Sequence, residues 1–200
     1  MYYYEKKFKK QGYSIIIGVD EAGRGPLAGP VVAAAVTLQN SRFINRIDDS
    51  KKLTATARER AFREITRKSI FGIGIIDEKI IDRINILQAT CMAMKVAVGS
   101  LTAKISSSKH KRIHIIVDGN LRLEIPFPYT CIIGGDGKSK SIAAASIIAK
   151  VTRDRIMNEY HKLYPEYGFA QHKGYPTAGH RDVLRKIGPS KIHRKSFSYG

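Results

Sequence analysis

Residues 14–38 read SIIIGVDEAGRGPLAGPVVAAAVTL, two apolar runs on either side of a glycine- and proline-rich segment. The first run, residues 14–20, is rich in β-branched side chains and ends in an acid, which predicts a buried strand that stops at Asp20. The second run, residues 30–38, is apolar almost throughout. Because only a tight loop separates the two runs, we expect neighbouring antiparallel strands.

Further apolar patterns along the chain alternate between strand and helix. A helix is expected from Thr54 or Thr56 to about residue 68, since Thr56 and Glu59 have capping-box spacing. Strands are predicted over residues 69–76, 113–118 and 129–136, and helices over 141–160 and 178–186. Strands and helices mix without strict βαβ alternation, so the fold class is α/β with a mixed sheet.

A longer helix is expected over residues 78–103. Apolar side chains recur there at alternating steps of four and three, which places them on one face. This stripe predicts packing against the sheet and consists of Ile80, Ile84, Leu87, Cys91, Met94 and Val98.

Charge indicates the class of partner. The chain has 35 Lys and Arg against 17 Asp and Glu, a formal net charge of +18. That excess repels itself unless a polyanion neutralises it, and nucleic acid is the commonest such partner. An anionic membrane surface or ribosomal RNA would neutralise it equally well. The length of 200 residues suits one domain. No run is apolar enough for a signal peptide or a membrane span, so we expect a cytoplasmic protein that does not act at a membrane.

Four acids stand where an apolar run gives way to a glycine-containing turn: Asp20, Glu21, Asp118 and Asp136. A carboxylate in that position lies at the rim of the sheet, where unpaired charge is costly. If the strands adjoin, the four carboxylates repel one another unless cations are present. Oxygen ligands of this kind suit Mg²⁺ or Mn²⁺, so the pattern predicts a divalent-metal site. The alternative is that each acid caps a loop or pairs with a nearby base.

The loop after the first strand contains Gly23 and Gly25 on either side of Arg24. Glycine lets the backbone approach a ligand that a Cβ would block, and Arg24 can contact phosphate. By itself the GRG pattern is weak, because it also occurs in ordinary turns.

The string GVDEAGRGPLAGPVVAAAV resembles the signature of ribonuclease HII. Five further blocks resemble that family's successive motifs and appear in the same order, so the resemblance spans nearly the whole chain. They are DSKKL (residues 49–53), IVDGN (116–120), GDGKSKSIAAASIIAKVTRDR (135–155), HKGYPTAGH (172–180) and GPSKIHRKSF (188–197).

Three other classes of protein fit less well. A nucleotide-binding P-loop ending at Gly137, Lys138 and Ser139 would need glycine at position 132, which is Ile132. A non-catalytic RNA-binding protein suits the charge but gives no reason for acids at three strand ends. Ribonuclease HIII has a loop that differs from DEAGRG.

The resemblance implies an RNase H-like fold: a mixed five-stranded sheet with flanking helices and a C-terminal helical extension. We accordingly expect a basic N-terminal tail (residues 1–12), an RNase H-like catalytic domain (13–160) and a C-terminal helical, basic segment that contributes to substrate binding (161–200). Nothing in the sequence indicates more than a monomer, which is the expected state.

The resemblance further implies the site and the reaction. Asp20, Glu21, Asp118 and Asp136 would be the catalytic acids and would hold two divalent ions, Mn²⁺ or Mg²⁺. Gly23, Arg24 and Gly25 would recognise a ribonucleotide through its 2′-hydroxyl, and Tyr175 would pack against the adjacent sugar. Pro176 departs from the family's usual GYGT block and alters the loop after Tyr175. Phosphate-binding or acid-binding roles are expected for Lys51, Lys173 and Arg194.

The expected substrates are RNA–DNA hybrids and DNA duplexes with an embedded ribonucleotide. Water would cut on the 5′ side of the ribonucleotide and leave 3′-hydroxyl and 5′-phosphate ends.

Overall fold

Five strands form one mixed sheet in the order β3-β2-β1-β4-β5 in the computed structural model, which describes residues 1–39 and 42–199. β1 pairs antiparallel with β2, as the short loop between them predicted, and parallel with β4. β2–β3 is antiparallel and β4–β5 is parallel, which confirms the expected mixed five-stranded sheet. The strands are β1 (Ile15–Ala22), β2 (Val31–Leu38), β3 (Ser69–Ile76), β4 (Ile113–Asp118) and β5 (Tyr129–Ile132).

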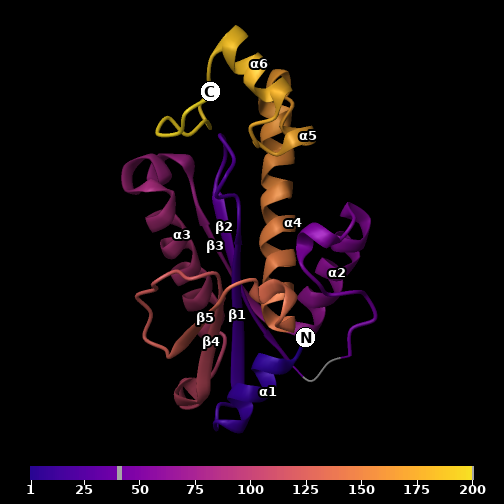
Figure 1. Ribbon diagram of the computed structural model, residues 1–200, viewed down its shortest axis with the longest axis vertical. Coiled ribbons are helices and arrows are strands. Elements are labelled where there is room, and N and C mark those ends of the chain that lie inside the picture. The colour runs from indigo at the N-terminus through magenta and orange to yellow at the C-terminus, as the bar shows by residue number, and fades with distance from the viewer. Residues whose placement is uncertain (40–41, 200) are drawn as a thin grey trace.

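Helices cover both faces of the sheet, so the side chains of β1 and β2 are buried on both sides. α3 lies against one face and α4, with α2 beside it, against the other (Figure 1). α1 lies at one end of the sheet, while α5, α6 and the C-terminus lie beyond the far end of α4. The α-helices are α1 (Tyr3–Lys10), α2 (Ala55–Lys68), α3 (Glu78–Thr102), α4 (Lys140–Leu163), α5 (Phe169–His172) and α6 (Ala178–Ile187). Short 3-10 turns are η1 (Ser50–Lys52), η2 (Ser107–Arg112), η3 (Gly135–Gly137) and η4 (Pro165–Tyr167).

α3 differs from the predicted stripe. Asn85 has φ 67° and breaks the helix, and its side chain accepts hydrogen bonds from the N–H groups of Leu87 and Gln88 at 2.9 and 3.1 Å, so it begins a second helical segment. The buried face includes Met94 and Val98 from the predicted stripe, but Leu87 is 45% exposed and the partly buried Ile80, Ile84 and Cys91 pack only at its edge. Small buried side chains, Ala89, Ala93 and Ala97, replace them and let the helix approach the glycine-containing strand β3 closely. By length and composition alone this helix would be long enough and apolar enough to cross a membrane. In this fold it packs on the sheet.

One of the two expected helix caps is confirmed, and three predictions about strand ends need correction. β1 does not stop at Asp20 but continues to Ala22. Thr54 caps α2, through a 3.2 Å hydrogen bond from the N–H of Ala57, and Thr56 lies inside the helix. β5 ends at Ile132, because Gly134 is left-handed (φ 64°) and turns the chain into η3. Asp136 therefore lies in a 3-10 turn and does not end a strand.

Residues 1–12, predicted as a basic tail, contain α1 (Tyr3–Lys10), which packs on the sheet. Phe8 is buried and its ring stacks on His114 of β4, with 3.8 Å between the ring centroids. The segment folds against the sheet because its apolar side chains complete a small core with residues of β1 and β4. The charge pattern alone did not reveal this.

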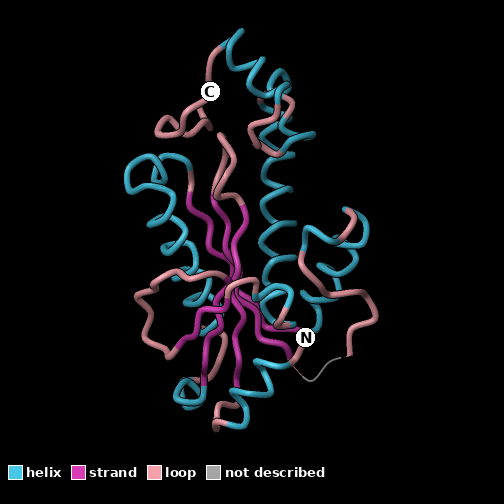
Figure 2. Tube along the Cα trace, in the orientation of Figure 1, coloured by secondary structure: helices cyan, strands magenta, loops and turns pink. Residues whose placement is uncertain are grey.

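The C-terminal segment packs on the loop between β1 and β2, which reaches toward it (Figure 2). Leu27 and Ala28 of that loop join a separate core with Met157, Phe169 and Leu184. Ala28 forms a backbone bridge to His193, and the N–H of Arg194 donates to the carbonyl of Leu27 at 2.8 Å. The predicted boundary at residue 160 falls inside α4, so one continuous helix joins the sheet to the C-terminal segment.

Candidate active site

Strand pairing brings the predicted acids together. Val19 of β1 pairs with Val117 of parallel β4, so the residues that follow, Asp20 and Asp118, lie side by side at the carboxyl ends of the two strands. Asp20, Glu21 and Asp118 line one cavity of about 210 Å³. Asp136 does not line it, but lies near enough that its charge raises the pKa of Asp20. We call these four residues the carboxylate cluster.

The cluster carries more negative charge than its surroundings neutralise. Asp20 is 6% exposed. Burial raises its pKa well above the usual range, and the charges of Glu21, Asp118 and Asp136 raise it further. Burial also raises the pKa of Glu21, although Arg24 opposes the shift through a contact of 3.4 Å. The pKa of Asp136 is raised by burial and then by Asp118. A cation at this place would relieve the repulsion.

The donor set fits a divalent ion. Oδ1 of Asp20 accepts a hydrogen bond from the N–H of Glu21 at 2.7 Å, and Oδ1 of Asp118 accepts one from the N–H of Gly135 at 2.6 Å. These bonds orient the two carboxylates and leave one oxygen of each for a ligand. Within residues 1–39 and 42–199, no three Asp, Glu, His or Cys side chains enclose a metal position by themselves. The two oriented carboxylates suit Mg²⁺ or Mn²⁺, because Mg²⁺ keeps several waters and binds substrate oxygens beside one or two carboxylates.

The GRG loop forms the wall next to the carboxylate cluster. Gly23 has φ +101°, and a Cβ there would collide with the side chain of Arg153, so the fold itself requires this glycine. Gly25 differs: a Cβ would come no closer than 3.9 Å to Tyr175. The protein has no internal need for glycine at 25, which leaves open space for an approaching ligand. Arg24 is 46% exposed beside that space.

Arg194 holds this loop from behind, which corrects its predicted direct contact with substrate. Its side chain is fully buried and donates to the carbonyl oxygens of Gly23, Arg24 and Gly29 at 2.6, 3.0 and 3.0 Å. Burial without an acidic partner lowers its pKa to about 9. Arg153 is buried in the same way and donates to the carbonyls of Ala28, Pro30 and Lys173. Both arginines position backbone and present no donor to a phosphate.

Of the other predicted contacts, Tyr175 and Lys51 line the cavity and Lys173 does not. Tyr175 is 39% exposed, and the Nζ of Lys150 lies 5.7 Å from its ring centroid. Burial lowers the pKa of Lys51, but the nearby acids, Asp49 first, outweigh burial and raise it. Lys173 donates to the Asn158 side chain at 2.8 Å and to the Ala170 carbonyl, away from the carboxylates.

Two buried histidines near Tyr175, His180 and His193, are structural. Ser190 N–H donates to Nδ1 of His193 at 2.9 Å, Nε2 of His193 meets Nε2 of His180 at 2.9 Å, and Nδ1 of His180 meets the carbonyl of Tyr175 at 2.9 Å. One set of neutral tautomers satisfies all three bonds. Burial keeps the rings neutral, lowering the pKa of His193 to about 4 and that of His180. The chain of bonds fixes the loop that carries Tyr175.

Two serines in the cavity wall were not predicted. Ser50 and Ser146 line the site, and the hydroxyl of Ser146 donates to that of Ser50 at 2.7 Å. This bond ties η1, which carries Lys51, to α4. The only signal in the sequence is a serine inside the alanine-rich stretch AAASIIA, where a hydroxyl needs a partner.

Comparison with known proteins gives the family. The family profile described as Ribonuclease HII matches residues 17–199. The chain belongs to the ribonuclease HII family. A ribonuclease HII of Acetivibrio thermocellus is 54% identical over 98% of this chain and 74% of its own length. The crystal structure of ribonuclease H2 from Pyrococcus horikoshii is 26% identical, with a TM-score of 0.74, over 92% of this chain and 94% of that one.

A more distant solved structure shares the fold alone. It is Bst-RNase HIII in complex with Mn²⁺, 19% identical with a TM-score of 0.78 over 96% of this chain and 70% of that one. Membership in the ribonuclease HII family makes the protein a metal-dependent endoribonuclease. The two solved structures confirm the RNase H-like fold that the resemblance implied.

Proposed function

We propose that this protein hydrolyses the RNA-containing strand of RNA–DNA hybrids and cuts duplex DNA on the 5′ side of an embedded ribonucleotide, leaving 3′-hydroxyl and 5′-phosphate ends. One observation carries the proposal: the carboxylate cluster, whose negative charge is only partly neutralised, lies beside the open space at Gly25. The family of the chain gives the same activity.

Asp20, Glu21, Asp118 and Asp136 would hold two divalent ions, Mg²⁺ or Mn²⁺. Asp20 would be the shared ligand, a role supported by its burial and by the effect of all three other acids on its pKa. When bound, the ions lower the pKa of the attacking water and neutralise charge on the leaving oxygen. Buried hydrogen bonds from Glu21 and Gly135 hold two of the carboxylates before substrate arrives, which reduces the cost of organising the site.

The loop at Gly23–Gly25 supplies discrimination. Only the 2′-hydroxyl distinguishes a ribonucleotide from its neighbours in DNA, so a protein group must come close to the sugar to detect it. The backbone at Gly25 has the room, and Arg194 fixes the carbonyl groups around it. Tyr175, whose ring is the group nearest to the open space at Gly25, is partly exposed and could pack against the adjacent sugar. Lys51 and Lys150 would contact phosphate.

We further propose a monomer that works in the cytoplasm on polyanionic substrates. The net charge of +18 supports a nucleic-acid partner, because released counterions favour binding to phosphates.

The test is cleavage of a labelled DNA duplex that contains one ribonucleotide, beside an all-DNA duplex and an RNA–DNA hybrid of the same sequence. We expect a single nick 5′ of the ribonucleotide with Mg²⁺ or Mn²⁺, none with EDTA, and none in the all-DNA duplex. Tight binding of all three duplexes with no cleavage under either metal would contradict the proposal.

A further inference from the structure

Glu5 of α1 is a buried acid outside the carboxylate cluster and outside the residues that match the family profile. It is 7% exposed. Its Oε1 accepts three hydrogen bonds, from the hydroxyls of Ser139 and Ser141 at 2.6 and 2.8 Å and from the N–H of Ser141 at 2.9 Å. Its Oε2 is buried and has no partner among residues 1–39 and 42–199. Burying a carboxylate with one oxygen unsatisfied is costly, so its position calls for an explanation.

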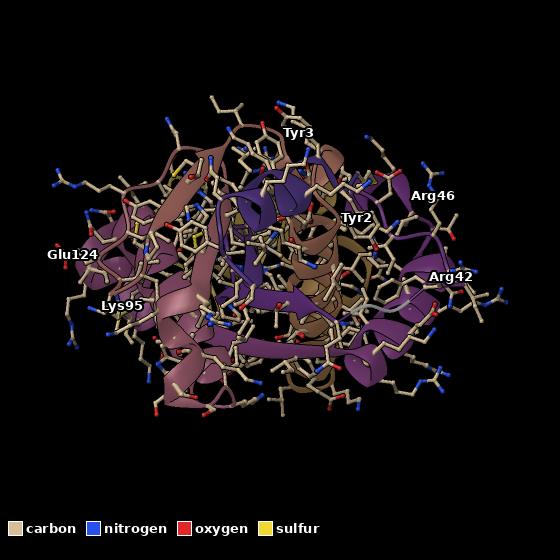
Figure 3. The ribbon with its side chains drawn as sticks, turned by 90° about the horizontal axis from the view of Figure 1, so that it is seen from below. Tyr2, Tyr3, Arg42, Arg46, Lys95 and Glu124 are labelled. Carbon is tan, nitrogen blue, oxygen red and sulfur yellow. The ribbon has the colours of Figure 1, made fainter. Side chains whose placement is uncertain are left out.

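The two serines form the first turn of α4. Ser139 is the N-cap, and its hydroxyl accepts the N–H of Ile142 at 3.2 Å. An acid placed beside the free N–H groups of a helix N-terminus is stabilised by the helix dipole. The start of the chain adds backbone contacts: the N–H of Lys140 donates to the carbonyl of Met1 at 2.7 Å, and Tyr2 forms a bridge with Ser139. Seen from the end that carries α1, Tyr2 and Tyr3 lie between Lys95 on one side and Arg42 on the other (Figure 3).

A short path of hydrogen bonds joins Glu5 to the carboxylate cluster. The N–H of Ser139 donates to the carbonyl of Gly135 at 2.7 Å, and the N–H of Gly135 donates to Oδ1 of Asp118 at 2.6 Å. Asp136 lies in the turn between Gly135 and Ser139. The start of α4 is also pressed against β1, since a Cβ at Gly18 would collide with the backbone of Ser141. Asp20 follows Gly18 by two residues on the same strand.

We propose that Glu5 is a positioning residue for the metal centre. By holding Ser139 and Ser141 it fixes the first turn of α4, and through Gly135 it fixes the carboxylates of Asp118 and Asp136. The N-terminal helix is thus part of the catalytic apparatus. This inference rests on the proposed function, because it takes the cluster as the metal-binding site.

The test is the affinity of the substrate-free protein for Mn²⁺, followed by the electron paramagnetic resonance signal of free Mn²⁺, together with kcat and KM. Glu5→Ala is expected to weaken Mn²⁺ binding about tenfold, as loss of a supporting contact behind metal ligands does, and to lower kcat more than it raises KM.

The matched control is Glu64→Ala. Glu64 is also buried, at 2% exposed, and accepts hydrogen bonds from the N–H groups of Ile44 and Asn45 at 2.9 and 2.8 Å and from Nζ of Lys68 at 2.7 Å. Its hydrogen bonds within residues 1–39 and 42–199 do not include η3 or the start of α4. We expect this variant to lose stability and to keep wild-type Mn²⁺ affinity. A general effect of removing a buried acid would instead weaken Mn²⁺ binding in both.

Glu5→Gln keeps an acceptor oxygen and removes the charge, so roughly threefold weaker Mn²⁺ binding is expected. If Glu5→Ala folds, its Mn²⁺ affinity decides whether the proposal holds. If it does not fold, the Mn²⁺ affinity of Glu5→Gln decides. Wild-type Mn²⁺ affinity in the deciding variant would overturn the proposal. A wild-type protein that binds Mn²⁺ without cutting any duplex would contradict the proposed function and leave the role of Glu5 standing.

Discussion

Replacing Asp118 with asparagine removes one negative charge from the carboxylate cluster and changes little else. The asparagine oxygen has the same position as Oδ1 and can still accept the N–H of Gly135, which donates to Asp118 at 2.6 Å. The side chains have nearly the same volume, so the packing of β4 is retained. Asp118→Asn therefore tests the charge of this residue separately from its place in the fold.

The metal-free variant is expected to be more stable than the wild type. Two carboxylates about 5 Å apart repel by about 3 kcal/mol at an effective dielectric constant of about 20. Loss of the attraction between Asp118 and Lys51 offsets part of this relief. We expect a net gain of about 1–2 kcal/mol in the free energy of unfolding, and 1 kcal/mol corresponds to about 2–4 °C in Tm for a protein of this size.

The gain should grow with pH. The pKa of Asp20 in the folded protein is raised well above that of an unfolded chain, so the folded state binds more protons. The metal-free protein therefore loses stability as pH rises from about 4 through the raised pKa of Asp20. Removing the charge of Asp118 lessens this loss, because that charge is one of the causes of the shift.

Activity is expected to move the opposite way. Without a full charge at 118 the cluster holds divalent ions less tightly, and we expect cleavage of the ribonucleotide-containing duplex to fall by about a hundredfold or more. The assay is thermal unfolding at pH 5 and pH 8, with EDTA and with Mn²⁺, beside kcat/KM. The control is Asp182→Asn. The exposed Asp182 side chain of α6 lies in a surface ion pair with Arg185, so its replacement should change neither quantity. Wild-type cleavage by Asp118→Asn, or lower metal-free stability at pH 8, would refute the reasoning.

Three further outcomes follow from the cavity and its supports. Tyr175→Ala should lower kcat/KM at a single embedded ribonucleotide by about tenfold, while Tyr175→Phe keeps the ring and most of the activity; equal rates for the two variants would count against a stacking role. Arg194→Met should cost about 3 kcal/mol in urea unfolding, because three buried carbonyls lose their donor. Arg194→Lys should recover little of it, since one ammonium cannot reach all three; full recovery would show that charge alone matters. Acid should weaken the loop that His180 and His193 support. The pKa of His193 is lowered to about 4 in the folded protein, so below about pH 6.5 the folded state binds fewer protons than the unfolded chain. The free energy of unfolding should therefore fall as the pH is lowered from about 6.5 to 4. We expect a loss of about 1–3 kcal/mol there, and a flat profile in urea titrations would argue that the rings are exposed.

Local patterns in the sequence determined most of the secondary structure. The β-branched runs before Asp20 and Asp118 predicted β1 and β4. Asp118 ends β4 as expected, whereas β1 continues two residues past Asp20 to Ala22. A continuous run of apolar β-branched side chains is a property of neighbouring residues, so it can be recognised in the sequence without knowledge of the fold. The order of the family-like blocks identified the family, which the comparisons confirm.

Tertiary structure alone decided what each residue touches. Arg194 was predicted to contact phosphate or the acids because it is a basic residue in a family-like block. In the structure it donates instead to backbone carbonyls 165 to 171 residues away in the chain. Glu5 stood in a run of tyrosines and lysines that predicted a tail, and its partners are 134 and 136 residues distant. Asp136 was expected at a strand end and lies in a turn that the left-handed Gly134 introduces. Contacts between distant segments produce no repeating pattern in the sequence. They arise only when the whole sheet assembles and buries the groups that it brings together.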